Sequence, residues 1–528
     1  MQLNFDTLYP SRRSPVLARN VVSSSQPLAA QAGLRMLLQG GNAIDAALAA
    51  AMTLTVVEPV MNGIGGDMFA LVWRKGELYG LESSGRSPAG WTRDHFGDRQ
   101  AMPQIGWDTV TVPGQVAGWK ELSARFGRLP FAELFAPAIH YAQEGFPLSP
   151  VIARIWSQQT ALLKNEPGFA QAWMPDGRAP VAGQTWRFQA QAETLAEISS
   201  TDGQSFYSGK LAERIADFAR ETGGKLTVDD LRAHKAQWVQ PISQEYNGYV
   251  LHEIPPSGQG IAALIGLGML QHFDLRSMGV DSADAYHLMA EAVKFAFADL
   301  HEHIGDAASM RVQVQELLDA DYLRKRANEI DLRKASAPTC GAPSNGGTVY
   351  LTAADAEGTM VSFIQSNFRG FGSGVTVPGT GISLHNRGAG FTLTRGHVNE
   401  AGPRKKPLHT IIPGFVTWAG KPVLSFGVMG GAMQAQGHLQ MVSRLADFAQ
   451  NPQAMCDAPR FRVDPGNLLR LEAHIPPAVA ADLRTRGHDV TVAPADSLDF
   501  GSAQLIQTTD SGYVAASDGR RDGQAVGY

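Results

Sequence analysis

The sequence has few cysteines and no long uninterrupted apolar run. Only Cys340 and Cys456 occur among 528 residues, which excludes a disulfide framework and suits a reducing compartment. No stretch reaches the roughly 18 apolar residues that a membrane-spanning helix needs. Residues 1–15 also lack the apolar core of a signal peptide. We therefore expect a cytoplasmic location and no membrane partner.

Charge is also sparse and evenly spread. Charged residues make up 18% of the chain, the formal net charge is −5, and neither sign forms a long block. This pattern gives no basis for nucleic-acid binding. His301, Glu302 and His303 are adjacent on an expected helix, where neighbours point in different directions, and no further ligands follow at a suitable spacing. We expect no metal and no cofactor.

The most informative segment that is present runs from Asn345 to Asp355. Residues 335–347 are rich in Pro, Ser, Gly and Ala, as in an exposed linker that can be cut. Gly346 and Gly347 then deliver Thr348 into a β-like run. On its own, the segment is either a plain loop entering a strand or a nucleophile site. If the Gly347–Thr348 bond is cut, the new α-amine of Thr348, with a pKa near ~8, can serve as the base that a threonine hydroxyl needs.

Periodicity predicts helices before this segment and mainly strands after it. Helical patterns with capping signals cover residues 27–39, 43–57 and 283–301, with Ser25 and Asn42 as the expected caps of the first two. β-like patterns cover residues 69–73, 77–82, 349–354, 359–365, 411–418 and 423–428. The helix at 43–57 is apolar nearly all round and should be buried. The chain is thus expected to be α+β with layered sheets.

Short motifs follow one another along nearly the whole chain in an order that resembles the γ-glutamyltransferase family of N-terminal-nucleophile (Ntn) hydrolases. They are Gly40–Ala47, Glu58–Pro59 with Gly63–Gly66, Ser84–Ala89, Val112–Gly118, Pro137–Ile139, Gly145–Pro147, Ala296–Asp299, Gly305–Asp306, Phe371–Gly374, Gly402–Pro403, Lys406–Leu408, Gly430–Gly431, Ala458–Phe461 and Gly527–Tyr528. Each motif is weak alone. The shared order is the evidence.

The resemblance implies a four-layer αββα sandwich built from two segments of a self-cleaved precursor. The segments would be 1–347, mostly helical, and 348–528, β-rich, and they would stay together as a heterodimer of the two fragments. The family needs no cofactor. Its members act on small amide substrates that carry a carboxylate.

The resemblance also assigns roles to individual residues. Thr348 would be the nucleophile, and Gly347–Thr348 the bond that is cut. Gly430 and Gly431 would supply backbone N–H groups to the oxyanion, and Ser366 the hydroxyl that hydrogen-bonds the nucleophile. Arg86 would grip a substrate carboxylate with its guanidinium. Asn367 lies one position away from the family's substrate-binding asparagine.

Three positions depart from the family pattern. Arg387 stands where a Gln is usual, and Gly390 where an Asp binds the ammonium of a γ-glutamyl group. His409 and Thr410 replace a pair of serines. The first two replacements each make the pocket more positive, which disfavours a substrate ammonium. His409 either orients the substrate or is a buried histidine with structural partners.

The sequence therefore predicts an autoprocessing Ntn amidohydrolase or acyltransferase that forms an acyl-enzyme on Thr348. A γ-glutamyl compound such as glutathione is the family default. The alternative within the family is hydrolysis of another amide, such as a glutaryl amide or the monoamide of a small dicarboxylic acid. A rival of another class is an uncut, inactive relative that serves as a binding protein.

Overall fold

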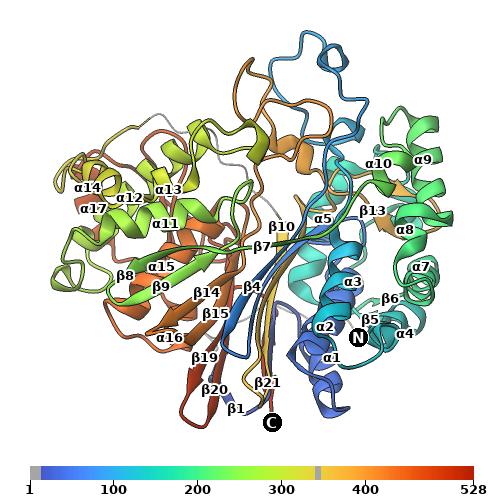
Figure 1. Ribbon diagram of the computed structural model, residues 1–528, viewed down its shortest axis with the longest axis horizontal. Coiled ribbons are helices and arrows are strands. Elements are labelled where there is room, and N and C mark those ends of the chain that lie inside the picture. Colours follow the sequence, from blue (N-terminus) through green and yellow to red (C-terminus); the bar gives the residue numbers. More distant parts are fainter. Residues whose placement is uncertain (1–12, 339–346) are drawn as a thin grey trace.

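Two seven-stranded antiparallel sheets form the centre of the protein (Figure 1). The computed structural model describes residues 13–338 and 347–528. The first, called here the β15 sheet, has the order β1 (Val16–Ala18), β20 (Gly512–Ser517), β19 (Ser502–Thr509), β15 (Lys421–Met429), β14 (Gly414–Trp418), β9 (Tyr249–Glu253) and β8 (Ile242–Tyr246). The second, the β10 sheet, has the order β21 (Gln524–Gly527), β2 (Val21–Ser24), β10 (Gly347–Ala354), β11 (Met360–Phe368), β3 (Asp67–Arg74), β4 (Glu77–Ser83) and β7 (Gln237–Val239).

The sheets pack face to face and helices cover their outer faces, so the expected four-layer αββα sandwich is confirmed. A buried apolar layer between the sheets includes Phe69, Leu71, Tyr350, Ile364, Phe415 and Ile506. The helices on the β10 sheet include α1 (Pro27–Leu38), α2 (Ala43–Val57), α3 (Gln115–Phe126), α4 (Ala136–Glu144) and α7 (Gln189–Ser200). Those on the β15 side include α11 (Gly260–Leu270), α12 (Ala283–His303), α15 (Met433–Ala446) and α16 (Pro452–Asp457).

Smaller elements surround this sandwich. The remaining helices are α5 (Pro150–Leu163), α6 (Phe169–Trp173), α8 (Gln204–Ser208), α9 (Lys210–Thr222), α10 (Val228–Arg232), α13 (Val314–Leu317), α14 (Ala320–Ala327) and α17 (Pro477–Thr485). The short strands are β5 (Phe146–Pro147), β6 (Thr185–Trp186), β12 (Thr376–Val377), β13 (Ile382–Ser383), β16 (Phe461–Val463), β17 (Leu468–Leu471) and β18 (Asp489–Val492). Among the described residues, no helix is both long enough and apolar enough to cross a membrane.

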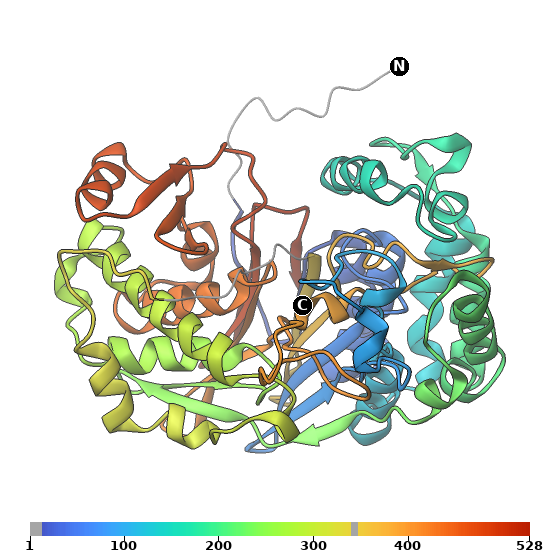
Figure 2. The ribbon, with the colours of Figure 1, turned by 90° about the horizontal axis from the view of Figure 1, so that it is seen from above.

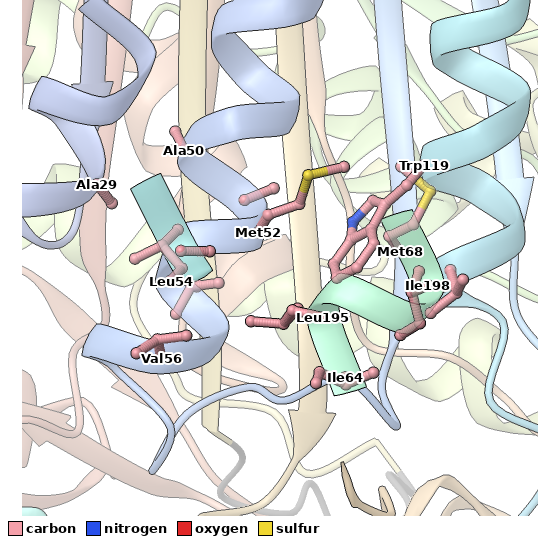
Figure 3. Close-up of a cluster of buried hydrophobic side chains, with 14 of the residues drawn as sticks. Ala29, Ala50, Met52, Leu54, Val56, Ile64, Met68, Trp119, Leu195 and Ile198 are labelled. Atoms are coloured by element: carbon pink, nitrogen blue, oxygen red, sulfur yellow. The ribbon is translucent and has the colours of Figure 1, made fainter. Parts of the chain in front are cut away.

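Helix α2 is buried along its whole length, as its all-round apolar sequence predicts. Asn42 caps it, accepting hydrogen bonds from the backbone N–H groups of Ile44 and Asp45. Figure 3 shows Met52, Leu54 and Val56 of this helix in the cluster that also holds Trp119 and Met68. This packing fixes α2 against the β10 sheet, which carries Thr348.

Most expected elements form within a few residues of their predicted ends, but the cap of α1 is different. The side chain of Gln26, and not of Ser25, accepts the N–H groups of Leu28 and Ala29. Ser25 instead donates a hydrogen bond to the buried carboxylate of Glu58 at 2.6 Å. A buried carboxylate needs a donor, and this need takes Ser25 away from the helix end.

Both sheets mix strands from the two sides of the Gly347–Thr348 bond. In the β10 sheet, β10 lies between β2 from the first part of the chain and β11 from the second. The view from above shows the same interleaving of early (blue) and late (gold to red) strands (Figure 2). The predicted division into segments 1–347 and 348–528 stays a prediction. Most of the predicted linker and Cys340 lie outside the described residues.

Candidate active site

Thr348, Ser366 and Asp67 form a row across one end of the β10 sheet. They belong to the neighbouring strands β10, β11 and β3, and Ser366 pairs directly with Asp67. Alternation along each strand puts these side chains on the face that carries Tyr350, Ile364 and Phe69. The row therefore faces the β15 sheet, at the end of the inter-sheet layer.

The hydroxyl of Thr348 is buried among polar atoms. Its Oγ1 lies 2.7 Å from the carbonyl oxygen of Gly347 and 3.1 Å from Oγ of Ser366. Ser366 donates to the same Gly347 oxygen at 2.5 Å and accepts from the backbone N–H of Phe368 at 2.7 Å. The carbonyl that precedes Thr348 is thus held by hydroxyl groups, which polarise it.

Gly430 and Gly431 lie between β15 and α15 in backbone conformations that favour glycine. Their φ angles are 133° and 62°. The amide of Gln259 donates to the Gly431 carbonyl at 2.8 Å and fixes the turn. The pair precedes the N-terminus of α15, where backbone N–H groups and the helix dipole favour negative charge. This placement suits an oxyanion site, and that role stays a prediction.

A cleft of about 500 Å³ opens beside this row. Phe368, which pairs with Gly347 across β10 and β11, lines it, as do Gly390, Thr410 and Ala432. Its apolar wall includes Met102, Phe297, Leu300, Ile304, Phe391, Leu393 and Leu408. Among the described residues that line it there is no aspartate or glutamate, and Arg369 is the one arginine. The cleft offers no carboxylate to a substrate ammonium.

Two histidines from the loops around this cleft approach the carboxyl group of Asp67. Its Oδ2 lies 3.0 Å from Nε2 of His409, and its Oδ1 lies 3.6 Å from Nε2 of His385. Each histidine accepts a backbone N–H at Nδ1, from Ile411 and Arg387 respectively. The ring proton is therefore assigned to Nε2, facing Asp67.

Burial governs the protonation of this group. It raises the pKa of Asp67 to about 7, although the nearby Arg387 charge opposes the shift. Burial lowers the pKa of His385 to about 3 and holds that of His409 below its usual value. At neutral pH both histidines are neutral. His409 has partners on both ring nitrogens, so its contacts are those of a structural histidine, while its substrate role stays a prediction.

Arg387 is a buried cation with spare hydrogen-bond donors. Only 1% of it is exposed, and burial lowers the pKa of its guanidinium to about 9. Its Nη1 donates to Oγ1 of Thr410 at 2.7 Å, and its guanidinium lies 4.8 Å from the centre of the Phe368 ring. Among the described residues, neither Nε nor Nη2 has a hydrogen-bond partner. The nearby Asp67 carboxyl favours this charge, but buried donors without hydrogen bonds remain costly.

Asn367 and Arg86 are placed differently. Asn367 is fully buried, and the absence of side chains at Gly63 and Gly66 makes room for its amide. Neither polar atom of this amide has a hydrogen-bond partner among the residues that the structure describes. Arg86 lines a separate cleft of about 280 Å³ and donates to Asp306 at 2.7 Å and to the Arg404 carbonyl. The structure therefore does not bring Arg86 into the cleft beside Thr410. The substrate roles of both residues stay predictions.

The sequence analysis missed four polar residues of this region: Asp67, Gln259, His385 and Gln434. Gln434 donates from Nε2 to Oγ1 of Thr348 at 3.3 Å. Its position, three residues after Gly431, was the available signal. The other three meet the rest of this region through distant parts of the chain: Asp67 with His385 and His409, and Gln259 with Gly431. No local pattern marks these contacts.

Comparisons with known proteins match nearly the whole chain to one group of related enzymes. The family model described as gamma-glutamyltranspeptidase matches residues 29–528. The glutathione hydrolase-like YwrD proenzyme of Bacillus subtilis is 36% identical over 98% of this chain and 99% of its own length. The oxamate amidohydrolase proenzyme of Klebsiella pneumoniae is 35% identical, with the same two coverages. The crystal structure of cephalosporin acylase from Bacillus halodurans is 44% identical, with a TM-score of 0.96 over 100% of this chain and 99% of that one.

The fold, the threonine at the head of an inner strand and these matches lead to one assignment. Ntn amidohydrolases of this kind are made as proenzymes, are cut into two chains and act on small amides. The chain belongs to the γ-glutamyltranspeptidase family.

Proposed function

We propose that Thr348 is the nucleophile of a self-cleaving amidohydrolase that prefers amide donors carrying a carboxylate but no α-ammonium. The nucleophile role of Thr348 rests on its hydrogen-bonded group with Ser366 and the Gly347 carbonyl. The substrate preference rests on the Arg387 donors that have no partner among the described residues, and on the cleft wall, whose described residues include no carboxylate.

The hydrogen bonds around the Gly347 carbonyl support a route for self-cleavage. Oγ1 of Thr348 attacks the Gly347 carbonyl carbon, and its proton passes, directly or through Ser366, to the carbonyl oxygen. The C–N bond then breaks and that proton moves to the nitrogen, which leaves a Gly347 ester on Thr348 and a free α-amine. Water hydrolyses the ester and releases the Gly347 carboxylate.

Turnover repeats this chemistry on the substrate amide. The free α-amine of Thr348 takes the hydroxyl proton as Oγ1 attacks, and the proton passes to the leaving amine. The N–H groups at Gly430 and Gly431 receive the developing oxyanion. Water, or an acceptor amine, then takes the acyl group from Thr348.

The charge of the site supports the substrate class. Arg387 can present a guanidinium fork to a carboxylate, whereas no described residue lining the cleft can pair with an ammonium. The aromatic and aliphatic wall suits a donor with a sizeable apolar part. The names oxamate amidohydrolase and cephalosporin acylase, borne by two relatives, also denote substrates other than γ-glutamyl compounds.

The nucleophile is tested by electrophoresis and end-group sequencing. The purified protein should give fragments of 347 and 181 residues (528 − 347), which stay associated without denaturant. The small fragment should begin Thr-Val-Tyr. Thr348→Ala should abolish cleavage and turnover, and Thr348→Ser should keep part of each. A single uncut band without activity would support the binding-protein alternative instead.

The substrate class is tested with matched anilides. We expect kcat/KM for a glutaryl anilide to exceed that for the γ-glutamyl anilide by roughly 30-fold or more, because a buried ammonium without a partner costs about 2–5 kcal/mol. A ratio that strongly favours the γ-glutamyl donor would restore the family default. A cytoplasmic location also stays a prediction, for cell fractionation to test.

A further inference from the structure

Gln434 is the one side-chain amide that touches the hydroxyl of Thr348 in the described part of the chain. It lies in the first turn of α15, is fully buried, and donates from Nε2 to Oγ1 of Thr348 at 3.3 Å. Its backbone N–H donates to the Gly431 carbonyl at 3.1 Å. One residue thus joins the glycine pair to the nucleophile.

The orientation of the Gln434 amide is fixed by its second contact. Its Oε1 accepts the backbone N–H of Ile412 at 3.0 Å. Because a backbone N–H can only donate, the oxygen of the amide must face Ile412, and the NH₂ group must face Thr348. The two contacts leave no alternative amide orientation.

This donor sets the direction of the hydroxyl chain. With an N–H pointing at Oγ1, the Thr348 proton must point away from Gln434, toward Ser366 or the Gly347 carbonyl. At the other end, the Phe368 N–H points at Oγ of Ser366, whose own proton points to Gly347. Two obligate donors therefore direct the Ser366 proton to the carbonyl that self-cleavage attacks, and the Thr348 proton to the same carbonyl or to Ser366.

We propose that Gln434 is a catalytic residue that fixes the Thr348 hydroxyl for attack and stabilises the negative charge on Oγ1 as the proton leaves. The inference rests on the proposed role of Thr348 as nucleophile. It concerns both self-cleavage and turnover, since both use the same oxygen.

The test is Gln434→Glu, with Gln436→Glu as the matched control. The first change keeps an oxygen for the Ile412 N–H but replaces the donor that faces Thr348. Gln436 lies two residues further on the same helix, is equally buried, and bonds Ala432 and Val463. Its substitution introduces the same charge away from the nucleophile, so it reports the cost of a buried carboxylate alone.

For Gln434→Glu we expect the self-cleavage rate and kcat to fall by roughly 10- to 100-fold, as for the loss of one donor to a developing charge. KM should stay within about threefold, because Gln434 does not line the cleft. The ratio of variant to wild-type kcat should rise as the pH falls, since the introduced carboxyl, once protonated, can donate again.

The inference is overturned if kcat of Gln434→Glu stays near the wild-type value, if the ratio does not depend on pH, or if Gln436→Glu loses as much. Should the buried carboxylate prevent folding, Gln434→Met gives the same comparison of kcat and KM without a charge. Thr348→Ala separates the two proposals. If Thr348→Ala is uncut and inactive while Gln434→Glu is fully active, only the role of Gln434 fails.

Discussion

Two buried polar clusters, one at the end of the layer between the sheets and one on helix α12 outside the β15 sheet, differ in how completely their hydrogen bonds are made. The Asp67 cluster comprises Asp67, His385, Arg387 and His409, beside the cleft. The Lys294 cluster comprises His287, Glu291, Lys294 and His488, between α12 and the segment before β18. Both contain a buried cation, a buried carboxylate and two histidines.

The Lys294 cluster is internally satisfied. Nζ of Lys294 lies 2.8 Å from Oε1 of Glu291 and 3.0 Å from both the Ser336 carbonyl and Oδ1 of Asn467. The two histidine rings are 2.8 Å apart, nitrogen to nitrogen. Among the described residues, none of its buried side-chain nitrogen or oxygen atoms lacks a hydrogen-bond partner. It ties the start of the predicted linker, at Ser336, to the C-terminal part of the chain at Asn467.

The Asp67 cluster leaves donors unused. In the described part of the chain, Nε and Nη2 of Arg387 have no hydrogen-bond partner although the side chain is buried. Buried donors without hydrogen bonds are costly, so these donors suit an anionic group that arrives with a ligand. The comparison teaches that a complete cluster serves the fold, whereas an incomplete one beside a cleft marks where a ligand binds.

The largest expected effect comes from breaking the complete cluster. Lys294→Met leaves the buried Glu291 carboxylate without its cation, so we expect a loss of about 3–5 kcal/mol in the free energy of unfolding. Differential scanning calorimetry measures it. Lys120→Met is the control, since Lys120 pairs with Asp202 at the surface and should change stability little. Equal effects of the two changes would contradict the assignment.

A substitution in the Asp67 cluster should lower activity and leave stability nearly unchanged. Arg387→Gln removes the spare donors, and we expect kcat/KM for a glutaryl anilide to fall by roughly 30- to several thousand-fold. The thermal midpoint should change little, because removing a desolvated guanidinium offsets the loss of its interaction with Asp67. A donor in which the glutaryl carboxylate is a neutral amide is the control. If the neutral donor loses as much, Arg387 does not bind the carboxylate.

Asp67 should make the stability of the folded protein depend on pH. Its pKa of about 7 in the folded protein lies above its ordinary value of 3.8, so the folded state binds the proton more tightly. This contribution to stability is present below about pH 4 and is lost as the pH rises through 7. Arg387, which favours the ionised form, and Glu82, which opposes it, act on the same carboxyl, beside His385 and His409.

Asp67→Asn removes that titration. Between pH 4 and 8 we expect the thermal midpoint of the variant to fall less than that of the wild type. The limit of the effect is about 1.4 kcal/mol for each unit of pKa shift. Parallel pH curves for the two proteins would show that Asp67 titrates at its ordinary pKa.

The smallest expected effect concerns metal. His287, Glu291 and His488 place ligand atoms within 4.8 Å of one another, but Lys294 already supplies a cation to this group. We therefore expect Zn²⁺ or a chelator to move the thermal midpoint by less than about 1 °C. A rise with Zn²⁺ that disappears in His488→Gln would show that the cluster takes a metal after all.

The sequence predicted the elements better than it predicted the contacts. Helix 43–57 was placed to the residue, because an asparagine cap and an all-round apolar stretch are local signals. The strand that carries Thr348 was predicted because the sequence pattern changes from helical to β-like directly after the glycine pair Gly346–Gly347. The cap at Gln26 was missed because Ser25 is taken by Glu58, which lies over 30 residues away.

The candidate site shows the same limit. The resemblance supplied Thr348, Ser366 and the glycine pair, and the structure puts Thr348 and Ser366 in contact. Asp67 and His409 are 342 positions apart and meet only because the two sheets pack face to face. No window of sequence contains such a pair. The placement of Arg86 in a separate cleft is likewise a property of the folded loops and not of its motif.

The pairing of β2 with β21 has a consequence for the order of events during synthesis. Residues 21–24 lie between β10 and the strand at residues 524–527, and the backbone oxygen of Tyr528 accepts the N–H groups of Arg19 and Asn20. The sheet that holds Thr348 is therefore complete only when residues 524–527 have left the ribosome. We expect the chain to close this sheet first and to cut itself only afterwards.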